Sequence, residues 1–299
     1  MPKVSIGLPV YNGELYICDA LNSLLAQTFT DFELLISDNA SEDNTGAICK
    51  EYASKNSNIR YIRQNRNLGL IENFRFVLDE ACGEYFIWAA ADDLQEPNFI
   101  SVLVKVLDDN PTFVCAMTDA KKIGNKPQML DDLGLLDDIR IGDVKNNWPN
   151  YRKRFFRNPT SNIYLCIYGL FKTEVIKSID LNYGNLHSIL SSMEISILAQ
   201  AALHGPIVSI SEPLKIYRIH EASAYNQEMK VLKSKNRLLR FFSVSRTLLL
   251  ISLRSNLPVY QKFVLMNTTI NTLLLRLASG LSKQGLKMIS KVAKYEKNK

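Results

Sequence analysis

The sequence predicts an α/β protein with a mostly parallel sheet and helices on both faces, followed by a helical, basic C-terminal extension. In the first 120 residues, short apolar runs alternate with longer stretches whose apolar residues recur at helical spacing. This alternation is typical of a parallel sheet. Beyond Tyr225 the strand-like runs stop, and residues 226–299 hold 15 lysines and arginines against two acids.

Composition indicates a globular protein whose charge is unevenly distributed. The 299 residues are 46% hydrophobic and carry a formal charge of +6. Residues 226–299 contribute +13, and residues 1–225 contribute −7, from 21 basic and 28 acidic side chains. We find no apolar run of about 18 residues, as a spanning helix needs, and no signal peptide. Five scattered cysteines without a C-x-x-C pair favour a reduced, cytoplasmic protein over a disulfide framework or zinc site.

The first half of the chain predicts five strands and four helices in alternation. The expected strands are Val4–Pro9, Phe32–Ser37, Ile59–Ile62, Tyr85–Ala89 and Phe113–Thr118. The expected helices are Glu14–Gln27, Ser41–Ser54, Leu70–Cys82 and Pro97–Asp108. Ser41 or Asp43 suits the N-cap of the second helix, and Gly83 suits the end of the third.

The second half predicts a less regular order of elements. Residues 120–150 are rich in glycine and acids and read as an irregular, lid-like insertion. A strand, a helix and two further strands follow, at Tyr164–Phe171, Ser188–Leu203, Pro206–Ile210 and Leu214–Ile219. Three helical patterns then run to the end, separated near Pro258 and Gly280. We therefore expect two parts, a domain of residues 1–225 and a helical, basic region of residues 226–299.

Polar loops should gather at one edge of this sheet, because ligands of open parallel sheets bind beyond the C-terminal strand ends. The loops are Pro9–Gly13, Asp38–Asn44, Asn65–Gly69 and Ala89–Asp93. Neither a G-x-G-x-x-G nor a G-x-x-x-x-G-K-[ST] segment is present, so phosphates would need another partner. The carboxylates of Asp92 and Asp93 suit Mg²⁺ or Mn²⁺. The alternative is that they cap the helix that follows Pro97.

Other loop residues also allow two interpretations. Asp38 could accept hydrogen bonds from backbone N–H groups of its own turn, or one from a nucleobase. Tyr11 could stack on a base or simply flank its loop. Asn67 and Gly69 could serve turn geometry alone.

Two stretches of the sequence resemble family 2 glycosyltransferases. They are VSIGLPVYNGELYICDALNSLLAQTFTDFELLISDNASEDNT, from Val4, and RNLGLIENFRFVLDEACGEYFIWAAADD, ending at Asp93. The resemblance covers residues 3–118 and continues more loosely to about Tyr225. It implies the GT-A fold, in which a Rossmann-like sheet binds a nucleotide-sugar.

The resemblance also implies roles for individual residues. Those matching nucleotide-sugar-binding positions are Pro9, Tyr11, Asn12, Asp38, Asn67, Gly69, Asn73 and Asp92. The family's D-x-D motif matches Ala91-Asp92-Asp93, which makes Asp93 the expected ligand of Mg²⁺ or Mn²⁺. His220, ending the segment Tyr-Arg-Ile-His, matches a histidine that can approach the metal, although a purely structural role is an alternative. Glu72 stands where many members have arginine, which puts a phosphate or base contact there in doubt.

The resemblance places the catalytic base at Glu194, eleven residues before Gly205. A carboxylate can take a proton from an acceptor hydroxyl. Alternatively, Glu194 is a first-turn acid that stabilises its helix. If the alignment with the family is shifted in this region, Asp180 is the alternative candidate for the catalytic base.

The C-terminal lysines predict a basic amphipathic helix. Lys283, Lys287, Lys291 and Lys294 share one face at helical spacing, opposite Leu281 and Val292. Such a helix suits the surface of an anionic membrane, although its apolar face could instead pack on the domain. No nucleic-acid-binding module accompanies it.

Together these features predict an inverting glycosyltransferase. The donor would be a nucleotide-sugar, with UDP or dTDP favoured by the resemblance. The acceptor would be a glycan or lipid-linked hydroxyl in bacterial surface polysaccharide synthesis, at the inner face of the cell membrane. A non-catalytic nucleotide-sugar binder and a sugar-phosphate nucleotidyltransferase are the alternatives, although the latter needs a glycine-rich phosphate loop that PVYNGE does not supply.

Overall fold

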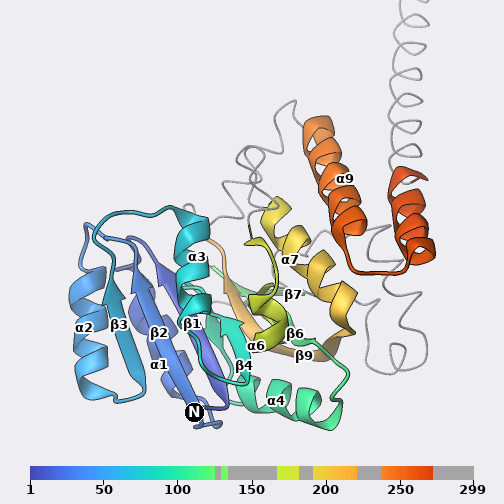
Figure 1. The fold of residues 1–299 in the computed structure, drawn as a ribbon. Helices are drawn as coiled ribbons and strands as arrows, with labels where there is room; N and C mark the ends of the chain where they lie inside the picture. The colour runs from blue at the N-terminus through green and yellow to red at the C-terminus, as the bar shows by residue number, and fades with distance from the viewer. Residues whose placement is uncertain (125–128, 134–166, 182–190, 221–236, 272–299) are drawn as a thin grey trace, which may run out of the picture.

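The structure is a computed structural model that describes residues 1–124, 129–133, 167–181, 191–220 and 237–271 (Figure 1). The strands are β1 (Val4–Val10), β2 (Phe32–Asp38), β3 (Ile59–Arg63), β4 (Tyr85–Trp88), β5 (Leu94–Gln95), β6 (Cys115–Ile123), β7 (Met129–Leu133), β8 (Leu170–Lys172) and β9 (Ile207–Arg218). The helices are α1 (Ile17–Leu25), α2 (Thr45–Lys55), α3 (Leu70–Asp79), α4 (Phe99–Asp109), α6 (Thr173–Lys177), α7 (Ser191–His204) and α9 (Arg237–Arg254), and residues 259–271 are also helical.

All strands of the described residues belong to one sheet, in the order β3-β2-β1-β4-β8-β6-β9-β5, with β7 paired to β6. The half β3-β2-β1-β4 is parallel throughout, as predicted. In the other half, β8 inserts antiparallel between β4 and β6, and only β6 and β9 are parallel. The predicted fold class is therefore confirmed, with a mixed second half.

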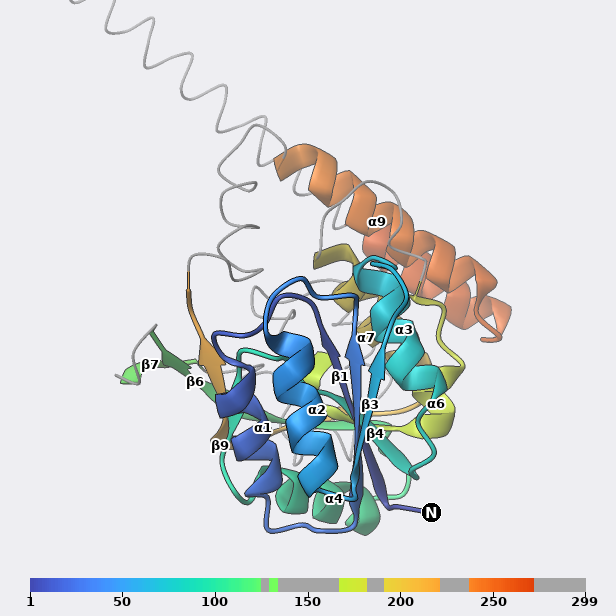
Figure 2. The same ribbon diagram turned by 90° about the vertical axis from the view of Figure 1, so that its left-hand side faces the viewer.

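Helices cover both faces of the sheet (Figure 2). On one face, α1, α2 and α4 pack on alternate strand residues such as Ile6, Leu34 and Ile36. On the other face, α3, α6, α7 and α9 pack on the opposite set, including Leu35 and Trp88. Because strand side chains point alternately to the two faces, β4 is apolar on both sides, with Tyr85 and Ile87 on one face and Phe86 and Trp88 on the other. On β1 and β2 the side toward α3 is partly polar, with Ser5 and Ser37 buried there.

The second half departs from the sequence predictions in three places. Part of the predicted insertion is regular, because β6 continues to Ile123 and pairs with β7. The two predicted strands at Pro206–Ile210 and Leu214–Ile219 are one strand, β9, whose register against β6 shifts near Asp119. The predicted strand Tyr164–Phe171 is the shorter β8, and residues 164–166 lie outside the described part, as do 134–150.

Asp92 and Asp93 do not cap the helix after Pro97, so this alternative is wrong. Helix α4 begins at Phe99 with Asn98 at its N-cap position and no side-chain cap. A two-residue strand, β5, separates it from Asp93 and pairs with β9.

The C-terminal region packs on the domain through part of its length. Leu248 and Ile251 of α9 and Leu265 of the next helix are buried with Ile197 of α7 in one core. The predicted basic helix around Lys283–Lys294 lies outside the described residues. Within those residues, no helix has both the length and the apolar character needed to cross a bilayer.

We predict that Gly83→Ala destabilises the fold. A Cβ at Gly83 would lie 2.6 Å from the backbone N of Ser5 and 2.8 Å from the carbonyl carbon of Val4. Because β1 backbone rather than a flexible side chain must give way, the free energy of unfolding should fall by about 1–3 kcal/mol. Urea denaturation measures this change. Lys50→Ala, at an exposed position of α2, should shift stability by less than about 0.5 kcal/mol; equal midpoints for the two variants would contradict the prediction.

Candidate functional site

Hydrogen bonds from backbone N–H groups to side chains join the loop that follows β1 to the loop that follows β2. The backbone N–H of Asn12 donates to Ser41 Oγ at 2.9 Å, and that of Gly13 to Thr45 Oγ1 at 2.8 Å. Asp43 accepts from the backbone N–H of Glu14 and from Thr45. Burial raises the pKa of Asp43, but hydrogen bonds from Thr45 and Glu14 outweigh it and hold the pKa below its usual value. The first two loops, Pro9–Gly13 and Asp38–Asn44, are therefore held together, and we call them the rim.

This rim contains strained backbone. Asn12 has φ of 50° and Ala40 of 60°, both in the left-handed region that non-glycine residues seldom adopt. Strain of this kind persists only where the surrounding contacts enforce it, and it often marks binding loops. Tyr11, next to Asn12, is 44% exposed and available to a ligand.

Asp38, at the end of β2, is fully buried and holds the second loop. Its carboxylate accepts from the backbone N–H of Ser41 at 2.8 Å, from the Tyr61 hydroxyl at 2.8 Å and from Arg63 at 2.7 Å. Burial and the Asp38 carboxylate raise the pKa of Tyr61 to about 12, so its hydroxyl remains a donor. The turn role of Asp38 is therefore observed, and its oxygens face protein donors.

The third loop is fastened by amides. Asn39 donates to the Asn67 side chain at 2.9 Å and accepts from the backbone N–H of Leu68 at 2.7 Å. Gly69 has φ of 86°, which explains glycine there. Asn73 is buried, accepts from Ser37 Oγ at 2.6 Å and donates to the Ser37 carbonyl. Asn73 therefore supports the loop from beneath.

The fourth loop brings Asp92 against His220, 128 positions later in the chain. Asp92 Oδ2 lies 2.9 Å from His220 Nε2, and the Asp92 side chain is 32% exposed. The His220 ring packs on the Tyr16 ring at a centroid distance of 4.7 Å. Arg218 lies 4.8 Å from the same Tyr16 ring and donates to Asp19 and to the Asp92 carbonyl. Arg218 therefore pairs with Asp19, an acid at the surface.

Asp93 points away from this exposed pair into the protein. Its side chain is fully buried, its Oδ2 lies 2.9 Å from Lys215 Nζ, and its Oδ1 accepts from the backbone N–H of Arg218. Burial raises the pKa of Asp93 against the opposing effect of Lys215. Lys215 is itself buried, and its ammonium lies 4.3 Å from the centre of the Tyr168 ring. The ion pair thus fixes the fourth loop to β9.

Glu194, in the first turn of α7, is 7% exposed. The pKa of Tyr168 is raised well above its usual value, first by burial and then by the charges of Asp93, Asp92 and Glu194 among others. Asp180, the alternative base, is 51% exposed and faces Arg75 at 3.9 Å instead.

The donor set is compatible with a hard divalent cation at Asp92 and His220. A carboxylate oxygen and an imidazole nitrogen are ligands that Mn²⁺ and Mg²⁺ accept. Asp93 fits less well, because Lys215 and a backbone N–H already occupy its oxygens. No group of three His, Cys, Asp or Glu side chains gathers within the described ranges, so substrate oxygens would have to complete such a site.

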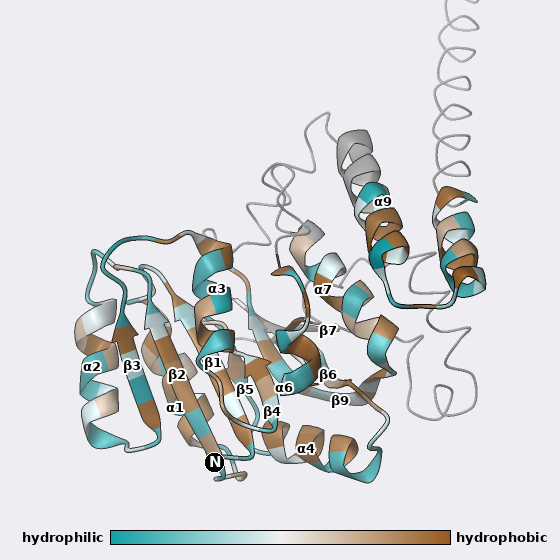
Figure 3. Cartoon of the chain, in the orientation of Figure 1, coloured by the Kyte–Doolittle hydropathy of each residue, from teal (hydrophilic) through white to brown (hydrophobic). Residues whose placement is uncertain are grey.

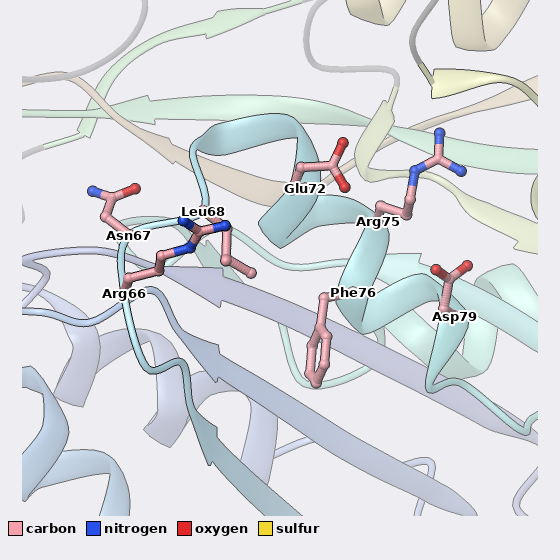
Figure 4. Close-up of a pocket in the computed structure, with 7 residues that line it drawn as sticks. All are labelled: Arg66, Asn67, Leu68, Glu72, Arg75, Phe76 and Asp79. Carbon is pink, nitrogen blue, oxygen red and sulfur yellow. The ribbon is translucent and has the colours of Figure 1, made fainter.

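A groove of about 440 Å³ opens beside the third loop, along α3 (Figure 4). Its lining residues are Arg66, Asn67, Leu68, Glu72, Arg75, Phe76 and Asp79. Glu72, which replaces the arginine of many family members, lies on this groove. The groove shares Asn67 with the loop cluster but contains neither Asp92 nor Glu194.

The fold and the loop cluster define a GT-A glycosyltransferase architecture, and solved structures share it. Residues 1–349 of S. aureus TarS in complex with UDP-GlcNAc align with a TM-score of 0.64 and 19% identity, over 90% of this chain and 72% of that one. Mannosyltransferase PcManGT from Pyrobaculum calidifontis, in complex with GDP-Man and Mn²⁺, aligns with a TM-score of 0.55 and 16% identity, over 96% and 80%. At these identities the likeness is one of fold.

The chain belongs to glycosyl transferase family 2, whose family model matches residues 5–180. A Haemophilus influenzae protein named an uncharacterized glycosyltransferase is 23% identical over 247 residues, 78% of this chain and 72% of that protein. A Rickettsia typhi protein with the same description is 37% identical over 108 residues, 36% of this chain. The match spans 32% of the Rickettsia protein's length.

Sequence reasoning missed three residues of this cluster, Tyr16, Tyr168 and Lys215. Tyr16 lies within the predicted helix Glu14–Gln27, and Lys215 lies within the predicted strand Leu214–Ile219, where neither stands out from its neighbours. Tyr168 lies where a strand was expected. The sequence offers one signal for Lys215: it is a lysine within a strand that is otherwise expected to be buried. Because lysine is almost never fully buried unless paired, a buried acidic partner could have been predicted.

We predict that Lys215→Met destabilises the protein because it leaves the Asp93 carboxylate buried without its cation. The free energy of unfolding, measured in urea, should fall by about 3–5 kcal/mol. The double variant Lys215→Met/Asp93→Leu should regain most of this loss, since replacing both partners removes the unpaired charge.

Lys105→Met is the matched control, because Lys105 pairs with Asp109 at the exposed surface of α4. Its effect should stay below about 1 kcal/mol. A Lys215→Met variant as stable as Lys105→Met, or a double variant no better than the single one, would contradict the assignment of a buried, coupled pair.

Proposed function

We propose that this protein is an inverting glycosyltransferase that transfers a sugar from a nucleotide-diphosphate donor to a hydroxyl of a glycan or lipid-linked acceptor. One observation carries the proposal. Asp92, which is 32% exposed in the fourth loop, lies 2.9 Å from His220, which follows β9, in a chain that belongs to glycosyl transferase family 2. A carboxylate–imidazole pair suits a charged diphosphate with its cation, and a separate carboxylate suits proton removal from an acceptor.

The donor's nucleotide would lie over the first three loops. Tyr11 offers an exposed ring for the base, with Pro9 and Asn12 shaping the same loop, and Asn67 and Gly69 line the opposite side. The Asp38 carboxylate would act chiefly by holding Arg63 and the second loop, because a base N–H could reach it only by displacing Tyr61 or Arg63. Asn73 would act from beneath the loop in the same way. UDP and dTDP remain the favoured nucleotides, as the family resemblance implies.

The transfer itself would be a single displacement at the anomeric carbon. The acceptor oxygen forms a bond to that carbon while the bond to the diphosphate oxygen breaks, so the configuration inverts. The leaving nucleoside diphosphate keeps the bonding electron pair. Glu194 accepts the hydroxyl proton of the acceptor, and its burial on α7 would limit competing water.

A divalent cation, Mg²⁺ or Mn²⁺, would neutralise the charge that develops on the leaving diphosphate. We propose Asp92 and His220 as its protein ligands, in place of the Asp93 expected from the family motif. The reason is orientation: Asp92 is partly exposed beside His220, whereas Asp93 is buried against Lys215.

The proposed acceptor and location are supported by the charge of the sequence. The +13 charge of residues 226–299 favours an anionic surface, and a lipid-linked acceptor in surface polysaccharide synthesis would be presented there. We accordingly propose a cytoplasmic protein that binds peripherally at the inner face of the cell membrane.

Glu194→Gln should abolish transfer while the fold survives. The amide keeps the size of the side chain but cannot accept the proton, so turnover should fall at least about a hundredfold. Glu174→Gln, in the first turn of α6 and exposed, is the control and should keep full activity. The assay follows nucleoside diphosphate release from a panel of nucleotide-sugars, with circular dichroism as the fold check. Near-normal turnover of Glu194→Gln would remove it from the mechanism.

Donor binding should depend on a divalent cation through Asp92. A bound donor stabilises the folded state by mass action, by about 2.7 kcal/mol at a hundredfold excess over Kd, and so raises the melting temperature. We expect Mn²⁺ to strengthen the donor-induced shift, EDTA to remove that gain, and Asp92→Asn to lose it. Asp109→Asn, an exposed acid on α4, should behave as wild type. If donor binding by Asp92→Asn depended on Mn²⁺ as it does in the wild type, Asp92 would be excluded as a metal ligand. If the wild type bound donors but turned over none of them, a non-catalytic nucleotide-sugar binder would be favoured.

A further inference from the structure

The turn between α9 and the helical residues 259–271 exposes apolar side chains. Leu253, Val259, Tyr260 and Phe263 have exposed fractions of 50, 83, 76 and 66%. We call these four residues the hairpin tip. Lys262 Nζ donates to the Leu253 carbonyl at 3.1 Å, which joins the last turn of α9 to the first turns of the next helix. The four residues therefore lie where α9 and the next helix are joined by a turn (Figures 1 and 3).

The opposite side of the same hairpin is firmly buried. Leu248, Ile251 and Leu265 are each 2% exposed and share a core with α7. Val259 and Phe263 are four residues apart and thus lie on one helix face, turned away from that core. The hairpin is a fixed element with two apolar sides, and the structure accounts for only one of them.

Charge indicates what covers the other side. Within the stretch that forms the tip, residues 253–263, the charged residues are Arg254 and Lys262, and residues 237–271 contain no acid. This charge favours an anionic partner. A second copy of this chain is disfavoured, because a two-fold contact would set identical cations against each other.

We propose that the hairpin tip inserts into the interface of an anionic lipid bilayer. Its apolar side chains would enter the headgroup–acyl boundary, as amphipathic surface helices do. Tyr260 suits the interface, where tyrosine is enriched, and Arg254 and Lys262 would meet anionic headgroups. This surface is separate from the predicted lysine-rich helix at residues 281–295. Its test does not depend on the proposed transfer activity.

Vesicle flotation of the full chain tests the proposal. Wild type should float with phosphatidylcholine vesicles that contain phosphatidylglycerol, and weakly with phosphatidylcholine alone. Val259→Asp/Phe263→Asp should lower the bound fraction about tenfold or more, because two charges would enter an apolar layer. Leu15→Asp, at a 78% exposed leucine before α1, is the matched control and should float as wild type does. Equal flotation of the double variant and wild type would overturn the proposal.

A spectroscopic probe separates insertion of the tip from binding by the lysine-rich tail. The fluorescence of Phe263→Trp should shift to the blue on adding anionic vesicles, and Leu15→Trp should not shift. Flotation without a shift of Phe263→Trp would assign binding to the tail and overturn the proposal. A second result would also overturn it: the wild type is a dimer in size-exclusion chromatography, and Val259→Asp/Phe263→Asp is a monomer that floats as the wild type does. In that case a second copy of the chain, and not a bilayer, would cover the tip.

Discussion

The parallel pairing of β1 with β2 on one side and β4 on the other is the constraint on which the rest of the site depends. The register sets Val10 opposite Asp38, and Asp38 opposite Arg63. Because these strands end at the same level, their loops meet without further adjustment. Hydrogen bonds between the first two loops and three hydrogen bonds to Asp38 then hold these loops together.

The other half of the site comes from far along the chain. Strand β9 contributes Lys215 at its interior and leads into His220, while β5 pairs with it directly after Asp93. The buried ion pair of Asp93 and Lys215 locks this junction, so Asp92 is left facing His220. The two adjacent aspartates are thus placed differently: Asp93 is buried and anchors the loop, and Asp92 is partly exposed beside His220. Replacing Lys215 or His220 would disturb a loop more than 120 positions away.

The C-terminal hairpin extends the same division between inward and outward faces. Its inner side completes the core over α7, the helix that carries Glu194, and so helps to hold that carboxylate in place. Its outer side is apolar and rimmed by cations. An interface at this side would tether the domain through an element that packs directly on the helix of the proposed base.

The sequence by itself determined the α/β class, the first four strands and their helices, and the loops that would converge. The helical spacing of apolar residues and the short apolar strand runs between them carry this information locally. The sequence could not determine which of Asp92 and Asp93 is exposed, that Pro206–Ile219 forms one strand, or that Tyr16, Tyr168 and Lys215 surround the cluster. These depend on pairings between residues far apart in the chain. The orientation of a side chain at a strand end is set by the partner that buries it, and Asp93 found that partner in Lys215 only when β9 joined the sheet.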